Sequence, residues 1–409
     1  MSMLAIRNGR IVDPVAATVT EGGVLVRDGL IAEVGDIEHG TYRRSDVVAD
    51  ARGALILPGL VDVGAFAVDP AAAKAGGVST TLLMPDQSPP LDDPALIQHA
   101  ATQGADLAVH PIAAATRGLA GRELAEIGLM RRAGAVAVAT GRGWIADSGL
   151  MHRLLSYAAA FDLVVIAHPE DGGLAGHAVA TDGEVATRLG LASAPAAAEA
   201  MAVARDLALA EETGARLHFR QLTTARAFDL LRAAKRRSVR VTCGVSPAHL
   251  LLSDQATATF RTFARLSPPL RSEEDRKAAV AAVGDGTVDI LCSNHDPRGP
   301  EAKRLPFAAA EPGMAGAATL ATLALTLERD GVVSLPRLVA MMTSEPARLF
   351  GIDAGTLAVG ARADLAILDD GQPWRIDAET LPGLAGNTPF DGLPVQGRVL
   401  TTVAAGRPL

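Results

Sequence analysis

Aromatic residues are scarce in this sequence, at 3% of 409 residues, although hydrophobic residues make up 49%. Alanine and 41 glycines fill the space that larger side chains would take. Small residues allow helices to lie close against strands, so this composition favours layered α/β packing. The length allows one large domain, or a barrel with a smaller domain, around a sizeable buried core.

Cysteine is also rare. Cys243 and Cys292 both lie inside apolar runs, which is typical of buried thiols on strands. Two cysteines are too few for a disulfide framework. No apolar run reaches the ~18–20 residues that a membrane span requires, and the first ten residues lack the pattern of a signal peptide. We therefore expect a cytoplasmic protein that does not contact a membrane.

The sequence has no basic arm and no acidic tail, and its formal net charge is −8. The basic run Lys235-Arg236-Arg237 is interpreted as a solvated helix end, so no binding of nucleic acid is predicted. A phosphate-binding G-x-x-x-x-G-K-[ST] loop is missing, and Gly-Arg-Gly at 141–143 is typical of a turn. Neither cysteine precedes the strained elbow on which a nucleophile would sit.

What the sequence does contain is a regular alternation of strands and helices. Eight strand-like runs with alanine-rich helical stretches between them predict a (β/α)8 barrel of the TIM type. The first of these runs, Ala54–Val63, is expected to be one continuous strand. The others are Val78–Met84, Leu107–Ala113, Ala135–Ala139, Leu163–Ala167, Leu217–Leu222, Val239–Val245 and Val288–Ser293. Helices are expected at Ala196–Thr213, Ala225–Lys235 and Glu273–Val283.

Both ends of the chain are β-like. Short apolar runs occur at Leu4–Ile6, Gly23–Val26 and Leu30–Val34, and again at Ala363–Leu368 and Gly397–Ala405. We predict that residues 1–56 and 352–409 form a composite β-sandwich domain, and that residues 57–351 form the barrel. The fold class is therefore α/β.

Catalytic groups of such a barrel lie at the C-terminal ends of its strands. Hydrolysis at two metal ions needs several imidazoles and carboxylates that converge on ions about 3.5–4 Å apart. The predicted strand ends offer His168, His295 and Asp296, with His249 nearby. This is a poor set for a metal centre. A single strand-end histidine is more often a hydrogen-bonded structural residue, and Asp296 could equally cap the turn that follows it.

Structural roles are predicted for the remaining histidines because they fall on helices, loops or strand interiors. These are His39, His99, His110, His152, His177 and His218.

Several segments resemble the dihydroorotases of the amidohydrolase superfamily, in order and almost from end to end. They are Leu57–Val63, Ser148–Met151, His168–Asp171, Ala208–His218, Val241–Cys243, Pro247–Asp254, Pro268–Arg276, Asp285–Asp289, Asn387–Gly392 and Gly397–Val399. The resemblance implies a metal-dependent-hydrolase barrel with a small β-sandwich built from both termini. It also implies the reversible cyclisation of carbamoyl aspartate to dihydroorotate in pyrimidine synthesis, by a zinc-bound hydroxide and an aspartate that moves the proton.

The positions that correspond to the family's metal ligands are mostly altered. The His-x-His pair falls on Gly64 and Phe66, and the bridging carboxylate or modified lysine falls near Thr140. One ligand survives as His168, and the next falls on Gln221. Neutral amides are weak zinc ligands, and a single histidine cannot hold the ion.

The positions for substrate and proton transfer are altered as well. Val68 stands where the family has an arginine for the substrate carboxylate, and Asp86 stands where it has an asparagine. The catalytic aspartate is Asn294, which cannot act as a general base; the following His295 remains, and the next histidine is Arg298.

The resemblance extends to degenerate dihydroorotase-like chains that assemble with the aspartate transcarbamoylase catalytic chain. We therefore predict a non-catalytic protein without zinc that is a structural partner of aspartate transcarbamoylase, in an oligomer. Two alternatives remain open. One is an active cyclic-amide hydrolase with a rebuilt or single-metal site that uses His168, His295, Asp296 or His249. The other is a ligand-binding or orphan protein without a fixed partner.

Overall fold

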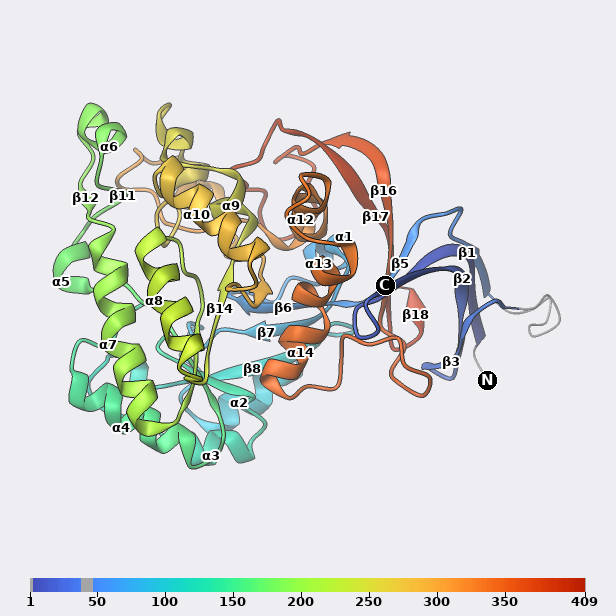
Figure 1. Ribbon diagram of the computed structural model, residues 1–409, viewed down its shortest axis with the longest axis horizontal. Coiled ribbons are helices and arrows are strands. Elements are labelled where there is room, and N and C mark those ends of the chain that lie inside the picture. The colour runs from blue at the N-terminus through green and yellow to red at the C-terminus, as the bar shows by residue number, and fades with distance from the viewer. Residues whose placement is uncertain (1–2, 38–46, 409) are drawn as a thin grey trace.

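The computed structural model describes residues 3–37 and 47–408. Figure 1 shows a barrel surrounded by helices and, at one side of it, a sheet that contains both chain termini. We call this second unit the terminal sheet. Among the described residues no helix is long and apolar enough to cross a membrane.

Eight parallel strands form the barrel in the order β15-β14-β13-β10-β9-β8-β7-β6, which confirms the predicted fold class. They are β6 (Leu60–Ala65), β7 (Val78–Leu83), β8 (Ala108–Ala114), β9 (Ala137–Ala139), β10 (Val164–Ala167), β13 (Arg216–Phe219), β14 (Val241–Val245) and β15 (Ile290–Leu291). At the two ends of this order, the backbone N–H of Ser293 donates to Asp62 and the N–H of Phe66 donates to the carbonyl of His295. The first and last strands are thereby tied together at their C-terminal ends.

Helices surround the barrel, and several of them begin after a capping side chain, such as Asp93 before α2, Asp147 before α4 and Ser272 before α10. They are α1 (Pro70–Gly76), α2 (Pro94–Ala101), α3 (Ile127–Arg132), α4 (Ser148–Ala159), α7 (Ala197–Thr213), α8 (Ala225–Arg236), α10 (Glu273–Gly284), α12 (Leu320–Arg329), α13 (Leu335–Met342) and α14 (Ser344–Phe350). Shorter elements in the loops are α5 (Gly172–Ala175), β11 (Ala180–Thr181), α6 (Glu184–Leu189), β12 (Ser193–Ala194), α9 (Pro247–Leu251) and α11 (Pro300–Lys303). The helices predicted at 196–213, 225–235 and 273–283 are α7, α8 and α10.

The terminal sheet joins strands from both ends of the chain in the order β18-β17-β16-β5-β1-β2-β3, with β4 beside β1. Its strands are β1 (Met3–Asp13), β2 (Thr18–Arg27), β3 (Leu30–Gly35), β4 (Val47–Asp50), β5 (Leu55–Pro58), β16 (Leu365–Arg375), β17 (Pro394–Ala404) and β18 (Arg407–Pro408). Leu4, Ile56 and Leu365, which come from both ends of the chain, share one apolar core in this sheet. The domain limits drawn at residues 56/57 and 351/352 remain a prediction.

The prediction of one continuous strand from Ala54 to Val63 was wrong. β5 ends at Pro58 and pairs with β16 in the terminal sheet, whereas β6 starts at Leu60 in the barrel. Gly59 connects them, and a Cβ at this position would lie 2.2 Å from Oγ of Ser79. The chain can therefore change sheets here only with a glycine, and an apolar pattern alone does not reveal the change.

The cysteines, the basic run at 235–237 and His218 all lie in structural positions. Cys243 and Cys292 are buried free thiols. Lys235 lies in the last turn of α8 and pairs with Asp289, while Arg237 just beyond the helix pairs with Glu211. His39 lies outside the described residues. His218 is buried on β13 with Nδ1 2.9 Å from Oγ1 of Thr242, and burial lowers its pKa to about 3.

Candidate functional site

The C-terminal ends of the barrel strands form the mouth of the barrel, where a parallel barrel positions its functional groups. At the end of β6, Gly64 has a φ of 79° and Phe66 is buried. Val68 is half-buried and packs against the main apolar core. None of these three side chains offers an atom that could bind a metal or a carboxylate.

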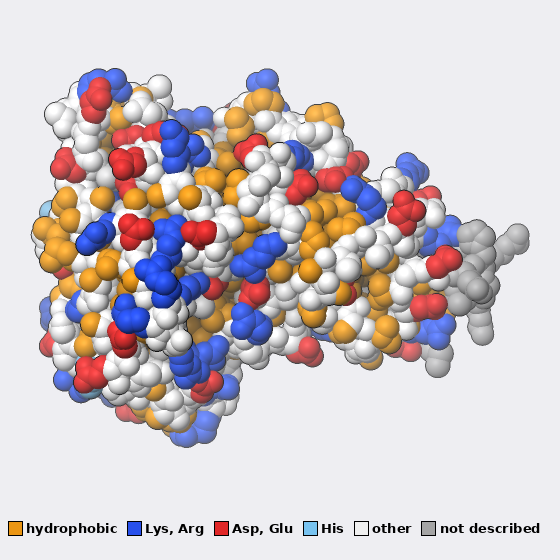
Figure 2. Space-filling view, viewed as in Figure 1, with side chains coloured by type: hydrophobic (Ala, Val, Ile, Leu, Met, Phe, Trp, Pro, Cys, Tyr) orange, Lys and Arg blue, Asp and Glu red, His pale blue; other side chains and the backbone are white. Residues whose placement is uncertain are grey.

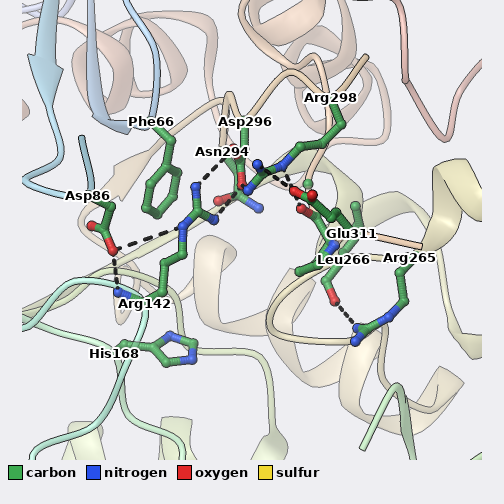
Figure 3. A network of polar contacts seen from close by, with 12 residues as sticks. Phe66, Asp86, Arg142, His168, Arg265, Leu266, Asn294, Asp296, Arg298 and Glu311 are labelled. Carbon is green, nitrogen blue, oxygen red and sulfur yellow. Dashed lines mark hydrogen bonds and ion pairs between the residues drawn. The ribbon is translucent and has the colours of Figure 1, made fainter. Parts of the chain in front are cut away.

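The Phe66 ring lies against two guanidinium groups. The Cζ atom of Arg142 is 3.8 Å from the ring centroid, and that of Arg220 is 4.9 Å from it. Arginine stacks favourably on an aromatic face, so the ring and the two cations stabilise one another. Figure 3 shows Phe66 and Arg142 side by side at the centre of this network.

Arg142 joins two carboxylates of the mouth. Its backbone N–H donates to Asp86 Oδ1 at 2.9 Å, and its guanidinium donates to both oxygens of Asp296, with Nη2 3.0 Å from Oδ1. Asp296 also accepts from Arg298 at 3.2 Å and therefore binds arginines; it does not cap a turn. Burial raises the pKa of Asp86, and the charge of Arg142 opposes this only in part.

Arg220 is buried at the end of β13. Its Nη1 donates to Oδ1 of Asn294 at 2.9 Å, and its Nη2 lies 3.3 Å from Nδ1 of His168. Burial lowers the pKa of Arg220, but a guanidinium remains protonated in proteins. A buried positive charge therefore connects β13 to the ends of β10 and β15.

His168 uses both of its ring nitrogens for protein contacts. Because Arg220 can only donate, Nδ1 accepts and the ring proton is on Nε2, which lies 3.5 Å from Glu170. Burial alone would raise the pKa of Glu170, but the contact with His168 and the charge of Arg271 outweigh it and lower the pKa to about 2. The backbone N–H of His168 donates to Thr140, which is buried beside it.

The two other histidines near the mouth are engaged in the same way. Nδ1 of His295 faces the backbone N–H of Ala317 at 3.3 Å, and its Nε2 lies 3.3 Å from Asp69. Nδ1 of His249 lies 3.0 Å from Oγ of Ser246, and its Nε2 lies 3.1 Å from the carbonyl of Pro268, which can only accept. Burial lowers the pKa of His249 to about 4.

Some buried polar atoms of the mouth have no hydrogen-bond partner. Gln221 is 1% exposed, and neither of its amide atoms has a partner among the described residues. Asp86 Oδ2, Arg220 Nε and His295 Nε2 also lack one there. Buried polar groups are normally paired, so these atoms mark an incompletely matched site.

A second buried cluster lies next to the mouth and is completely paired. Glu199 of α7 accepts hydrogen bonds from the backbone and hydroxyl groups of Thr223 and Thr224. Arg271 reaches Glu199 at 3.4 Å and Glu170 at 3.5 Å. We call Glu199, Thr223, Thr224 and Arg271 the Glu199 cluster; Glu170 links it to His168.

The residues of the mouth do not fit a zinc centre. Within residues 3–37 and 47–408, no group of three or more His, Cys, Asp or Glu side chains is arranged to hold a metal ion. Structural and catalytic zinc sites use three or four such ligands. Here His168 lacks a free lone pair, Phe66 is apolar, and Arg220 brings a positive charge to the same space.

The structure brings Phe66, Asp86, His168 and Asn294 into one network, together with Asp296 and Arg298. His295 faces Asp69 instead of this network. Arg142 and Arg220 were not predicted from the sequence as site residues. Each lies within two residues of an altered ligand position, Thr140 or Gln221, so a basic residue beside an altered ligand position was the available signal.

Comparisons with known proteins agree with this architecture. A dihydroorotase of Syntrophotalea carbinolica is 38% identical over 420 residues, which cover 99% of this chain and 98% of the relative. A Pseudomonas aeruginosa protein named dihydroorotase-like protein is 38% identical over 418 residues and 98% of both chains. The structure of an L-hydantoinase (dihydropyrimidinase) from Arthrobacter aurescens superposes with a TM-score of 0.88 at 26% identity, over 100% of this chain and 96% of that one. The sequence model of the amidohydrolase family matches residues 81–409. Because this match covers most of the chain and the curated relative is 38% identical over 99% of it, the chain belongs to the amidohydrolase family and is a homologue of the dihydroorotases.

Proposed function

We propose that this protein is a dihydroorotase homologue of pyrimidine biosynthesis that performs no catalysis, holds no zinc, and acts in the cytoplasm as a structural partner of aspartate transcarbamoylase. One observation carries the first part: His168, the surviving ligand position, has Arg220 on Nδ1 and Glu170 on Nε2. A zinc ligand must offer an unprotonated nitrogen that no other group occupies.

The proton chemistry of the mouth supports the same conclusion. A general base must be able to take a proton from a reacting group. Asn294 has no basic atom, and its carbonyl oxygen accepts from Arg220. Asp296 accepts from Arg142 on both oxygens and from Arg298 on one of them, so its carboxylate is held by arginines.

The partner is proposed by resemblance. A protein that keeps its fold but lacks a catalytic site can still function by binding a partner through its surface. Lys and Arg side chains lie among Asp and Glu over the face shown in Figure 2, and this face favours a protein partner over nucleic acid. A specific interface with aspartate transcarbamoylase should bury at least ~1,200 Å² in total and be poor in charge at its centre.

The competing function is an active cyclic-amide hydrolase with a rebuilt or single-metal site. The names of the curated relatives favour it, since the first of them are dihydroorotases. The ring nitrogens of His168 and His249, all of which face protein groups, argue against it.

Metal analysis of the purified protein, together with an assay of dihydroorotate hydrolysis and carbamoyl aspartate cyclisation, separates the two functions. We expect less than about one zinc per chain and no turnover, because a stable site needs three or four ligands. Stoichiometric zinc with turnover would establish the competing function. Phe66→His or Gly64→His alone should remain inactive because residues that act as a unit are not additive.

Co-expression with aspartate transcarbamoylase followed by size-exclusion chromatography tests the partner. We expect one co-eluting complex and a change in transcarbamoylase activity when this protein is left out. Separate elution at micromolar concentration, with transcarbamoylase activity unchanged, would reject the partnership and leave an orphan protein.

A further inference from the structure

The centre of the barrel mouth is filled by the side chain of Arg220. It contacts Asn294 and His168 through hydrogen bonds and the Phe66 ring through its guanidinium. A Cβ at Gly64 would lie 3.4 Å from Cδ of Arg220. One guanidinium at the end of β13 therefore meets side-chain positions from the ends of β6, β10 and β15.

The charges at this centre balance without any bound ion. Arg142, Arg220 and Arg298 carry three positive charges, and Asp86, Asp296 and Glu311 carry three negative charges when ionised. Asp86 is among the groups whose charge acts on Arg220. A divalent cation added here would face two guanidinium groups in a buried environment, where like charges repel strongly.

We propose that Arg142 and Arg220 are internal cations that cross-link the strand ends in place of a bound metal, and that Arg220 is the residue that closes the barrel mouth to metal ions. This inference deepens the proposed non-catalytic function and rests on it. It adds that the mouth not only lacks a set of metal ligands but also holds a fixed positive charge at their position.

The test restores ligands with and without Arg220. The triple variant Phe66→His, Gln221→His, Asn294→Asp gives the mouth three imidazoles, with His168, and one carboxylate. It is titrated with Co²⁺, whose visible absorption bands report a low-coordinate site. We expect no such bands while Arg220 is present. When Arg220→Ala is added, Co²⁺ should bind at least about tenfold more tightly, the scale on which groups next to the ligands alter metal affinity.

A matched control replaces an arginine outside the mouth. Arg205 also stacks on an aromatic ring, Trp144 at 3.9 Å, and pairs with a buried carboxylate, Asp206. Arg205→Ala in the triple variant should not create Co²⁺ binding. Equal Co²⁺ affinity with and without Arg220, or none in either case, would overturn the role assigned to Arg220. The zinc content and activity of the unaltered protein decide the proposed function separately.

A second measurement does not depend on folding of the multiple variants. Arg220→Lys keeps the charge, whereas Arg220→Met has a similar length and no charge. We expect the melting temperature to fall by several degrees more for Arg220→Met, because Asn294 and His168 lose their donor and the carboxylates lose a counter-charge. Equal losses in the two variants would reject the internal-cation role.

Discussion

Glu199 and Asp86 are both carboxylates buried close to the barrel mouth, but their surroundings differ. Every donor that Glu199 meets is directed at it: two backbone N–H groups, two hydroxyls and Arg271. Asp86 has one backbone donor on Oδ1, a guanidinium at 3.9 Å and no partner for Oδ2 among the described residues. Complete pairing is typical of scaffold, whereas incomplete pairing is typical of a site whose former ligand set has changed.

The residues of the Glu199 cluster and those of the mouth therefore have different roles in the structure. The Glu199 cluster ties α7 to the loop after β13 and to Arg271, so it holds the barrel together. The mouth residues are held together by two arginines around an apolar ring. Substitutions in the Glu199 cluster should therefore lower the free energy of unfolding strongly. Substitutions of the polar residues in the mouth should lower it by amounts that differ widely from residue to residue.

The largest effect is expected for Glu199→Gln. Breaking a buried ion pair by removing one partner costs about 3–5 kcal/mol in the free energy of unfolding, and Arg271 would remain buried with only Glu170, at 3.5 Å, as a counter-charge. Urea denaturation measures this loss. Glu311→Gln is the control, because its pair with Arg298 is exposed and should contribute at most about 1 kcal/mol. Similar losses in both variants would contradict the stabilising role of the Glu199 cluster.

Glu170→Gln should cause the next largest loss in the free energy of unfolding, and this loss should depend on pH. The pKa of Glu170 in the folded protein, about 2, lies below the ordinary value of 4.5, so its stabilisation is present above pH 4.5 and disappears as the pH falls toward 2. Glu170→Gln should therefore cost on the order of 2–3 kcal/mol at pH 7 and little near pH 2. Urea unfolding at a series of pH values measures the difference, and a cost that does not vary with pH would contradict the assignment.

A smaller contrast is expected inside the mouth itself. Asp296→Asn removes the bidentate partner of Arg142 and should cost about 2–3 kcal/mol, as for hydrogen bonds to charged groups. Asp86→Asn should cost less than about 1 kcal/mol, because relief from burying the charge offsets the weaker contact with Arg142. Thermal and urea unfolding of both variants test the order. If Asp86→Asn is the more damaging, Asp86 is the principal anchor of Arg142.

The smallest effect is expected for Gln221→Met. The Gln221 amide is buried without partners, so an apolar side chain of similar length should change stability by less than about 1 kcal/mol, and stabilisation is allowed. Thr223→Val is the counterpart in the Glu199 cluster and should cost about 1–3 kcal/mol, because its hydroxyl donates to Glu199. A large loss in Gln221→Met would show that the amide has a bonded partner in solution.

The sequence by itself determined the alternation of eight strands with helices, the terminal sheet from both ends, and the family to which the chain belongs. Periodic apolar patterns carry this information because each strand or helix must bury one face wherever it lies. The sequence also indicated which ligand positions had changed, from Gly64 and Phe66 to Asn294, since residue identity alone decides whether an atom can bind a metal. Only the tertiary structure decided that Gly59 separates two sheets and that Arg142 and Arg220 fill the barrel mouth. Those contacts join residues as many as 154 positions apart, and long arginine side chains reach places that local sequence patterns do not encode.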